Sequence, residues 1–289
     1  MNSFELEQAA ARLCRRYDFL RVDAIGCSVL GRPLLQLTIG EGAKRVGFNA
    51  AHHANEWITT PLLLRFLAQY AAGVRDGDAR YTQLYRRCTL DIVPMLNPDG
   101  ADLVTGALGE GCPAYAQARA IAARFPHIPF PSGWKANIQG LDLNLAYPAQ
   151  WERARQIKHA KGFCCPAPRD YPGPAPLAAV ESAALYRRTI AADYQLVLAY
   201  HTQGRLIYWD FEGRGDYALA QKMGAASGYS VELPPAESSA AGYKDWFIQS
   251  FGRPGFTIEA GHGRNPLPLC QLNEMFHENL PILLLALHS

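Results

Sequence analysis

The stretch Arg45 to Pro61, RVGFNAAHHANEWITTP, decides the fold of this 289-residue chain. Its short apolar run at residues 46–48 predicts a buried strand, and residues 57–70 predict the helix that follows. His53 and Glu56 stand in the turn between the two elements. An open α/β sheet builds its site at such strand ends, because the loop lies outside the packed layers while the sheet fixes its position.

An imidazole and a carboxylate with two residues between them can converge on one metal ion across such a turn. With a third protein ligand from elsewhere, His53 and Glu56 would leave zinc an open coordination position, as catalytic zinc sites do. An exposed polar loop is the competing interpretation, because a pattern of two fixed positions arises by chance in many chains. His52 would point the opposite way from His53 in an extended segment.

The composition bounds the class of protein. The chain is 49% hydrophobic and 19% charged, which is typical of a globular protein. Nothing after residue 176 resembles a separate domain, so residues 1–289 are expected to form a single catalytic domain. The formal net charge of +2, with dispersed lysines and arginines, argues against a nucleic-acid or membrane partner.

The N-terminus and the cysteines favour the cytoplasm. Asn2 and Glu5 have capping-box spacing, which predicts a folded helix instead of a signal peptide. No apolar run reaches the length of a membrane span. The seven cysteines lack regular spacing, so reduced thiols are expected. The vicinal pair Cys164-Cys165 could be a soft metal site, although no second pair supports it.

Strand and helix patterns alternate along the chain without an internal repeat. We expect a hairpin at 20–40, a turn at Asn97-Pro98-Asp99-Gly100, an irregular wall at 101–133 with a short helix at 116–125, and a surface loop at 152–176. The second half predicts helices at 181–192, 216–227, 244–251 and 272–288, and strands at 194–200, 205–210 and 256–258. This order predicts a single α/β domain with a mixed, mostly parallel twisted sheet of about eight strands, flanked by helices on both faces.

Two further strand ends carry candidate site residues. His201 follows the apolar strand 194–200 and could be the third zinc ligand, although a core histidine bonded to the backbone is an equal alternative. Glu259 stands at the tip of strand 256–258, where an unpaired carboxylate is costly. A functional role is therefore favoured over an ion pair with Arg253.

In this order and spacing, the chain resembles the zinc carboxypeptidase family. The resemblance rests on five motifs: His53-x-x-Glu56, Asn97-Pro98-Asp99-Gly100, Trp134-Lys135 with Gly140-Leu141-Asp142-Leu143-Asn144, His201, and Phe256-Thr257-Ile258-Glu259 ahead of Gly261. Within the family it is most similar to the γ-D-glutamyl-L-diamino acid endopeptidases, bacterial enzymes that act on the peptidoglycan stem peptide. That narrower resemblance rests on residues 242–247, GYKDWF, and 265–268, NPLP.

The resemblance implies a zinc carboxypeptidase-like fold, one Zn²⁺ ion and a role for each matching residue. His53, Glu56 and His201 would be the zinc ligands, Glu259 the general base, Asp142 the carboxylate that orients a ligand imidazole, Lys135 the oxyanion donor and Asn144 a substrate-binding residue. Lysine stands where the family usually has an arginine, and it lacks the bidentate fork of a guanidinium.

Two departures from the family pattern bear on the substrate. Leu145 stands where the family has the arginine that binds a C-terminal carboxylate, and Asn55 replaces another common arginine. A leucine cannot compensate a carboxylate, so an ordinary carboxypeptidase is disfavoured. The remaining candidates for substrate binding are Tyr243, Asp245 and Arg264, with Arg214 a weaker one. A core aromatic beside Trp246 is the alternative for Tyr243, and a solvent-exposed side chain is the alternative for each arginine.

The expected activity is hydrolysis of the γ-D-glutamyl-diamino acid bond in imported muropeptides. Three alternatives stay open: a conventional carboxypeptidase with a carboxylate clamp from outside position 145, a zinc-dependent deacylase of N-acyl amino acids, and a catalytically silent peptide-binding module. The third is the weakest, because ligands, base and oxyanion donor are all present.

Overall fold

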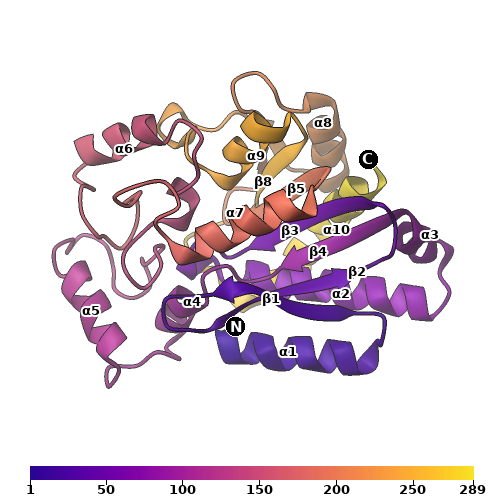
Figure 1. Cartoon of the computed structure of the whole chain (residues 1–289), viewed down its shortest axis with the longest axis horizontal. Coiled ribbons are helices and arrows are strands. Elements are labelled where there is room, and N and C mark those ends of the chain that lie inside the picture. Colours follow the sequence, from indigo (N-terminus) through magenta and orange to yellow (C-terminus); the bar gives the residue numbers. More distant parts are fainter.

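An eight-stranded sheet runs through the computed structural model, which describes residues 1–289 (Figure 1). The strands are β1 (Arg21–Cys27), β2 (Pro33–Ile39), β3 (Lys44–Ala50), β4 (Cys88–Val93), β5 (Leu196–His201), β6 (Leu206–Tyr208), β7 (Ser230–Glu232) and β8 (Gly255–Glu259). Their order across the sheet is β1-β2-β4-β3-β5-β8-β6-β7. The centre, from β4 through β3 and β5 to β8, is parallel, whereas β1, β2 and β6 join through antiparallel pairs. The predicted mixed, mostly parallel sheet is confirmed.

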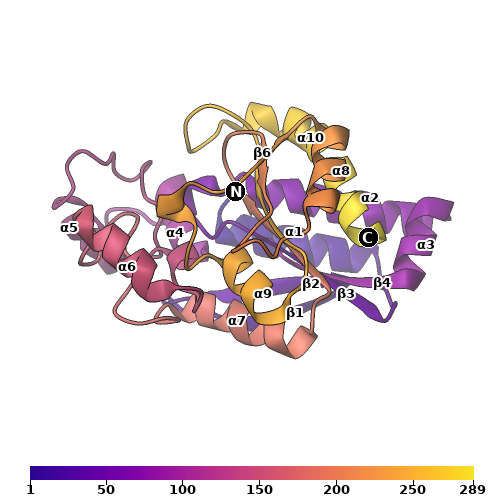
Figure 2. The ribbon, with the colours of Figure 1, turned by 90° about the horizontal axis from the view of Figure 1, so that it is seen from above.

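Helices cover both faces of this sheet. They are α1 (Ser3–Arg16), α2 (Thr59–Arg75), α3 (Ala79–Arg87), α4 (Pro98–Thr105), α5 (Pro113–Ala122), α6 (Trp151–Ala160), α7 (Val180–Ala192), α8 (Tyr217–Ser227), α9 (Tyr243–Phe251) and α10 (Leu272–His288). The larger hydrophobic core joins α1, α2, α8 and α10 to one face, and a smaller core joins α7 and α9 to the other. Figure 2 shows α8 and α10 on one side of the sheet and α7 and α9 on the other.

Local sequence explains where several helices begin and end. The Asn2 side chain accepts a hydrogen bond from the Glu5 amide (2.9 Å), and the Glu5 carboxylate accepts one from the Asn2 amide (3.0 Å), so the predicted capping box is present. The hairpin at 20–40 and the helix at 272–288 are also confirmed. None of the helices combines the length and the apolar character needed to cross a bilayer.

The predicted turn at 97–100 is wrong, because these residues begin helix α4. Asn97 caps the helix by accepting a hydrogen bond from the Gly100 amide (3.1 Å), and Pro98 occupies the first helical position. Proline is tolerated there because the amide that it lacks would have no partner inside the helix. Asparagine followed by proline can therefore start a helix as readily as it makes a turn.

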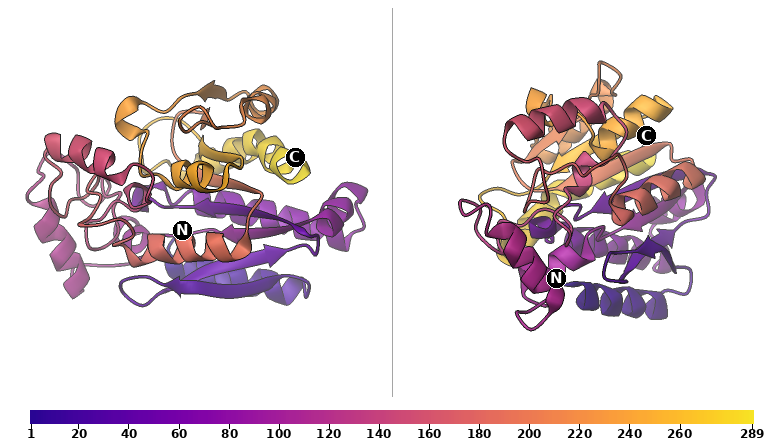
Figure 3. Two further views of the ribbon diagram at one scale, coloured as in Figure 1. Left: turned by 45° about the horizontal axis from the view of Figure 1, so that its top comes forward. Right: turned by 60° about the vertical axis from the view of Figure 1, so that its left-hand side comes forward.

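The predicted surface loop at 152–176 is wrong in its first part. Helix α6 covers Trp151–Ala160, a stretch that contains neither glycine nor proline. Trp151 packs with Ala240 and Ala241, which fixes the helix to the rest of the chain. Figure 3 shows α5 and α6, in magenta and rose, with the long loops beside them at one end of the molecule. Within the expected irregular wall at 101–133, the short helix predicted at 116–125 is present as α5, three residues earlier in the chain, and the stretch also contains most of α4. Neither α3 nor β7 was predicted.

Candidate metal centre and active site

The carboxyl ends of the central parallel strands meet at one edge of the sheet. Ala50 at the end of β3 is in register with Tyr200 of β5, and His201 of β5 is in register with Glu259 of β8. Segments about 150 and 60 residues apart in sequence are thereby brought side by side. The sheet register alone places His201 beside Glu259 and next to the end of β3, from which the turn with His53 and Glu56 begins.

The turn after β3 is fixed by polar contacts. A 3-10 helix at Ala54–Glu56 leads into α2, and the Thr59 hydroxyl donates to the Glu56 carbonyl (2.7 Å). Asn97 donates from its side-chain amide to the carbonyls of His52 (3.1 Å) and Ala136 (2.9 Å). The cap of α4 thus ties the turn after β3 to the loop that carries Lys135, a positioning role that the predicted turn did not suggest.

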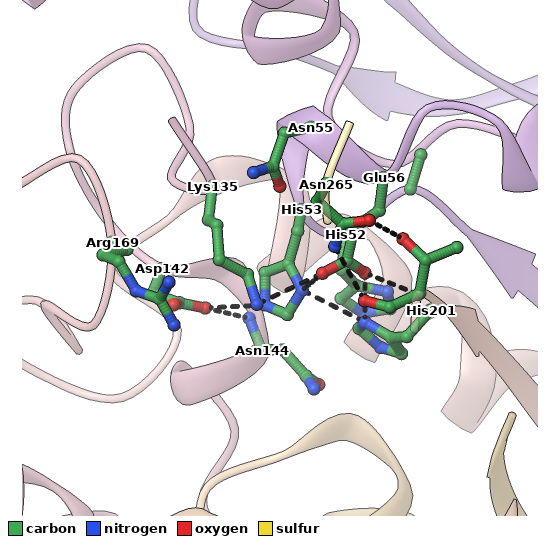
Figure 4. A network of polar contacts seen from close by, with 12 residues as sticks. His52, His53, Asn55, Glu56, Lys135, Asp142, Asn144, Arg169, His201 and Asn265 are labelled. Atoms are coloured by element: carbon green, nitrogen blue, oxygen red, sulfur yellow. Dashed lines mark hydrogen bonds and ion pairs between the residues drawn. The ribbon is translucent and has the colours of Figure 1, made fainter. Parts of the chain in front are cut away.

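Three ligand-type side chains converge at this edge (Figure 4). His53 Nδ1 lies 3.0 Å from Glu56 Oε1, His201 Nδ1 lies 3.0 Å from Glu56 Oε2, and the two Nδ1 atoms are 3.1 Å apart. All three side chains are buried. The ligand atoms of His53, Glu56 and His201 all lie within 4.8 Å of one another. His52 is not part of this group; its Nε2 atom contacts the Tyr147 hydroxyl at 3.1 Å.

The donor set fits zinc. Nitrogen and carboxylate ligands at 2.0–2.2 Å around a tetrahedral ion would stand about 3.3 Å apart, which is near the distances between the facing atoms. Two imidazole nitrogens face each other here beside a carboxylate. Unless one imidazole is charged, the group has too few N–H donors to satisfy all of these acceptor atoms. A cation among the ligand atoms would satisfy all three, and a three-ligand set leaves one position open.

Two charged residues surround the ligand group. Asp142 Oδ1 lies 3.1 Å from His53 Nε2, so it holds the ring with Nδ1 turned toward Glu56. Asp142 itself accepts hydrogen bonds from the amides of Asn144 (3.2 Å) and Asp170 (3.1 Å). Lys135 Nζ lies 3.1 Å from Glu56 Oε1, and its side chain is 18% exposed.

The pKa shifts report a site that favours positive charge at its centre. Burial lowers the pKa of His53, but the carboxylates of Glu56 and Asp142 outweigh burial and raise it to about 9. Burial raises the pKa of Glu56, but His53 and Lys135 outweigh it and hold that pKa well below its usual value. The carboxylates that favour a proton on His53 would equally favour a dication between the ligand atoms.

Glu259, in contrast to Glu56, has a raised pKa. Desolvation by the surrounding protein, and then the negative charge of Glu56, raise the pKa of Glu259 to about 8, against the effect of Lys135. Its carboxylate has no ion-pair partner; Arg253, the alternative partner considered from the sequence, pairs with Asp193 at 2.6 Å. A carboxylate that binds a proton near neutral pH is suited to transferring one.

Two cavities meet at this centre. The first has a volume of about 660 Å³ and the second about 200 Å³. Four residues line both: Lys135, Arg169, Tyr208 and Glu259. A substrate that occupied both cavities would lie against the cation of Lys135 and the carboxylate of Glu259.

The structure separates the predicted substrate-binding residues. Asn144 and Asp245 line the second cavity, and Arg264 lines the first. Tyr243 lines neither cavity. Its ring is 1% exposed, and its hydroxyl is 2.9 Å from that of Thr189 in α7, so this prediction is corrected: the ring faces the core. Arg214, the weaker candidate, also lines neither cavity.

Sequence reasoning missed three cations in the second cavity. Lys158 lies in α6, Arg169 follows α6, and Lys244 lies in the first turn of α9; all three line the cavity beside the buried side chain of Leu145. Arg169 stands next to Asp142 (Figure 4). The absence of an arginine at position 145 was the signal to search for cations elsewhere, but spacing in sequence could not identify them.

Comparison with known proteins identifies the relatives of this chain. The model of a family described as zinc carboxypeptidase matches residues 6–281. Gamma-D-glutamyl-L-diamino acid endopeptidase 1 of Lysinibacillus sphaericus is 41% identical over 284 residues, which cover 96% of this chain and 69% of the relative. The chain belongs to the zinc carboxypeptidase family.

Solved structures agree with this membership at the level of the fold. Thrombin activatable fibrinolysis inhibitor has a TM-score of 0.76 at 19% identity, covering 100% of this chain and 74% of its own. Murein-tripeptide amidase from Escherichia coli O157 has a TM-score of 0.57 at 18% identity, covering 91% of each chain. As a member of the zinc carboxypeptidase family, the chain is a zinc-dependent hydrolase with a His-Glu-His group compatible with one zinc ion, as predicted.

Proposed function

We propose that this zinc carboxypeptidase relative hydrolyses the amide bond between the γ-carboxyl group of D-glutamate and a diamino acid in peptidoglycan stem peptides. The observation that carries the proposal is the 41% identity, along 96% of the chain, to a relative whose name states that specificity. The substrate is a peptide, and neither nucleic acid nor membrane takes part.

His53, Glu56 and His201 would hold the ion. When bound, zinc supplies a Lewis acid that lowers the pKa of water and offsets negative charge on a carbonyl oxygen. Asp142 fixes the tautomer of His53, because its carboxylate accepts the proton on Nε2 and leaves Nδ1 free to bind the metal.

Glu259 would be the general base and then the general acid. Its carboxylate takes a proton from the water that attacks the amide carbon, and it then gives that proton to the leaving amine nitrogen. The same desolvation that raises its pKa strengthens its attraction for the proton. Lys135, which lines both cavities as this base does, would compensate the charge that develops on the carbonyl oxygen.

The leucine at position 145 supports an endopeptidase over a conventional carboxypeptidase. Leu145 is buried in the wall of the second cavity and offers no charge to a C-terminal carboxylate. The bond at a γ-glutamyl link leaves the α-carboxylate of D-glutamate free on the other side of the cut, a group that an ordinary peptide bond lacks.

Mass analysis of products from defined peptides tests the proposal. The zinc-loaded enzyme is expected to cut L-Ala-γ-D-Glu-diamino acid peptides at the γ-linked amide and to leave the α-linked isomers intact. Amidation of the C-terminus should leave cleavage in place, whereas it would stop a conventional carboxypeptidase. Release of C-terminal residues from ordinary peptides, or cleavage of small N-acyl amino acids alone, would overturn the proposal.

A further inference from the structure

Arg169 lies where the two cavities meet, and it lines both of them. The first cavity has an excess of positive charge among its lining side chains. Its cations are Lys135, Arg169 and Arg264, and Glu259 is its one carboxylate. His127, which also lines this cavity, adds positive charge when it is protonated. The first cavity is therefore suited to a substrate group that carries negative charge.

The backbone on either side of Arg169 is bonded to the loop that carries Lys135 and Asp142. The Pro168 carbonyl accepts a hydrogen bond from the Lys135 amide (2.7 Å). On the other side, the Asp170 amide donates to Asp142 Oδ2 (3.1 Å). The side chain of Arg169 thus starts from a fixed point next to Asp142 (Figure 4), as a residue that selects a substrate requires.

The guanidinium group of Arg169 has free donors. Its Nε atom lies 2.6 Å from Asp170 Oδ2, and this is the one protein acceptor that the guanidinium meets. Lys158 Nζ lies 2.6 Å from the other oxygen of Asp170, so a single carboxylate faces two cations. The neighbouring carboxylate of Asp142 is already bonded to His53 and to two backbone amides. The four N–H groups on the Nη atoms of Arg169 can therefore bind a substrate acceptor.

The proposed substrate has a carboxylate within reach of this guanidinium. In a γ-linked D-glutamyl residue, four carbon–carbon bonds of about 1.5 Å join the reacting carbonyl carbon to the α-carboxylate, so the two groups are at most about 5 Å apart. Since the reacting carbonyl lies at the metal centre, where the two cavities meet, the α-carboxylate must bind close to this junction.

Arg169 suits that carboxylate better than the other cations of the first cavity do. Lys135 Nζ is paired with Glu56 Oε1 at 3.1 Å and is assigned to the carbonyl oxygen, and Arg264 lines the first cavity but not the second. A guanidinium can also bind a carboxylate through two parallel N–H···O bonds, whereas an ammonium cannot.

We infer that Arg169 is a specificity residue, which binds the α-carboxylate of D-glutamate on the acyl side of the cut bond through its Nη atoms. The inference rests on the proposed function, because it names the residue that recognises the glutamate of the γ-linked substrate. The chain thereby has a bidentate carboxylate partner at its active site although positions 55, 135 and 145 lack arginine.

Two substrates and three variants test this inference. The substrates are L-Ala-γ-D-Glu-diamino acid and the same peptide with D-isoglutamine, in which the α-carboxylate is an amide; each is made with meso-diaminopimelate and with L-lysine, so that the choice of diamino acid does not decide the outcome. The wild-type enzyme should cleave the D-glutamate peptide with a kcat/KM about 10- to 50-fold higher, mainly through KM, because amidation removes a charge-assisted hydrogen bond.

The variants assign this preference to a side chain. Arg169→Gln should lower kcat/KM for the D-glutamate peptide by a similar factor and leave the D-isoglutamine peptide nearly unchanged. Arg169→Lys should keep part of the preference, because it keeps the charge and loses the fork. Arg75→Gln is the matched control: Arg75 lines neither cavity, is also 44% exposed, and also pairs through Nε with the aspartate that follows it.

The outcomes separate this inference from the proposed function. Equal cleavage of the two peptides by the wild-type enzyme would overturn the role of Arg169 and leave the endopeptidase in place. A loss of kcat in Arg169→Gln that is the same for both peptides would also overturn it, because the guanidinium would then act at the reacting carbonyl. Cleavage of neither peptide would overturn the proposed function itself. The wild-type comparison needs no variant, so an Arg169→Gln protein that failed to fold would still leave the inference open to refutation.

Discussion

Two buried polar clusters in this molecule differ in how their charges are satisfied. The anchor cluster consists of Ser3, Ser28, Arg32, Asp99 and Asp102, and it joins the N-terminus and the β1–β2 hairpin to α4. In it, each carboxylate oxygen accepts hydrogen bonds from protein donors: Asp102 from the Ser3 amide and hydroxyl (2.7 Å each), and Asp99 from the Ser28 hydroxyl (2.8 Å) and the Leu30 amide (2.9 Å).

The ligand group of His53, Glu56 and His201 lacks this balance. There two imidazole nitrogens face each other and a carboxylate, and all three converge on one point. Burial of charge is common to both clusters, so burial alone does not mark a functional site. An excess of acceptors over donors does mark one, because these acceptors are satisfied together only when positive charge is added, as a proton on an imidazole or as a metal ion.

The largest effects are expected where the ligand group is broken. His53→Ala removes a ligand and should abolish both zinc content and turnover. Glu259→Gln keeps the ligands but removes the proton carrier, so zinc content should be unchanged while kcat falls about 10²- to 10⁴-fold. Metal analysis and steady-state kinetics on the γ-linked peptide measure the two effects. An active Glu259→Gln enzyme would refute the assignment of the base.

A substitution that breaks the anchor cluster is expected to lower the stability of the fold without changing catalysis. Asp102→Ala removes one of the two carboxylates that pair with Arg32 and leaves two donors of Ser3 without their acceptor, and it is expected to lower the free energy of unfolding by about 2–3 kcal/mol. Zinc content and kcat/KM of the folded fraction should not change. Urea unfolding measures the loss, and Asp76→Ala, in the fully exposed pair with Arg75, is the control that should leave the midpoint unmoved. Loss of zinc in Asp102→Ala would remove the distinction between the clusters.

The sequence predicted the central strands and the polar residues at their ends. Apolar runs that end in polar residues predicted β3, β5 and β8, and with them the side chains that now meet at one edge of the sheet. The role of Asn97 was misjudged because proline at the first position of a helix and proline in a turn look alike in sequence.

Contacts across the fold were beyond such reasoning. Tyr243 was a candidate for substrate binding, but two residues along a helix turn a side chain by about 200°, so while Asp245 lines the second cavity the ring of Tyr243 faces α7. Arg169 and Lys244 reach the second cavity from a loop and a helix that no periodicity links. Their convergence depends on how α6 and α9 pack, which spacing does not encode.

A smaller effect is expected at the carboxylate that orients His53. Asp142→Asn can still accept a hydrogen bond from Nε2 through its amide oxygen, but it loses the negative charge that favours a cation at the centre. Zinc affinity should fall about 10- to 100-fold, with the fold and its stability largely kept. Competition with a chelator of known affinity measures it. An affinity equal to that of the wild-type enzyme would show that the carboxylate only fills space beside the ring.

The smallest expected effect concerns Glu181, a buried carboxylate between the two clusters. It accepts hydrogen bonds from the Asn137 side chain (3.1 Å) and from the Val29 amide (3.3 Å), and Asn137 in turn accepts one from the Leu141 amide in the loop that leads to Asp142. Burial raises the pKa of Glu181, and these hydrogen bonds oppose the shift without cancelling it. The folded protein therefore holds this proton more tightly than the unfolded chain does.

The sign of the pH dependence follows from that difference. Because the folded-state pKa is the higher one, the contribution of Glu181 to stability is fully present below its unfolded pKa and is lost as pH rises through the folded pKa. Glutamine has no proton to release, so Glu181→Gln should remove this part of the pH dependence. The wild-type protein should gain stability relative to the variant as pH falls from 7 toward 4, in urea unfolding followed at several pH values. A difference that stays constant with pH, or one that grows as pH rises, would mean that Glu181 is ionised in the folded state and belongs, like Asp102, to the carboxylates that donors satisfy.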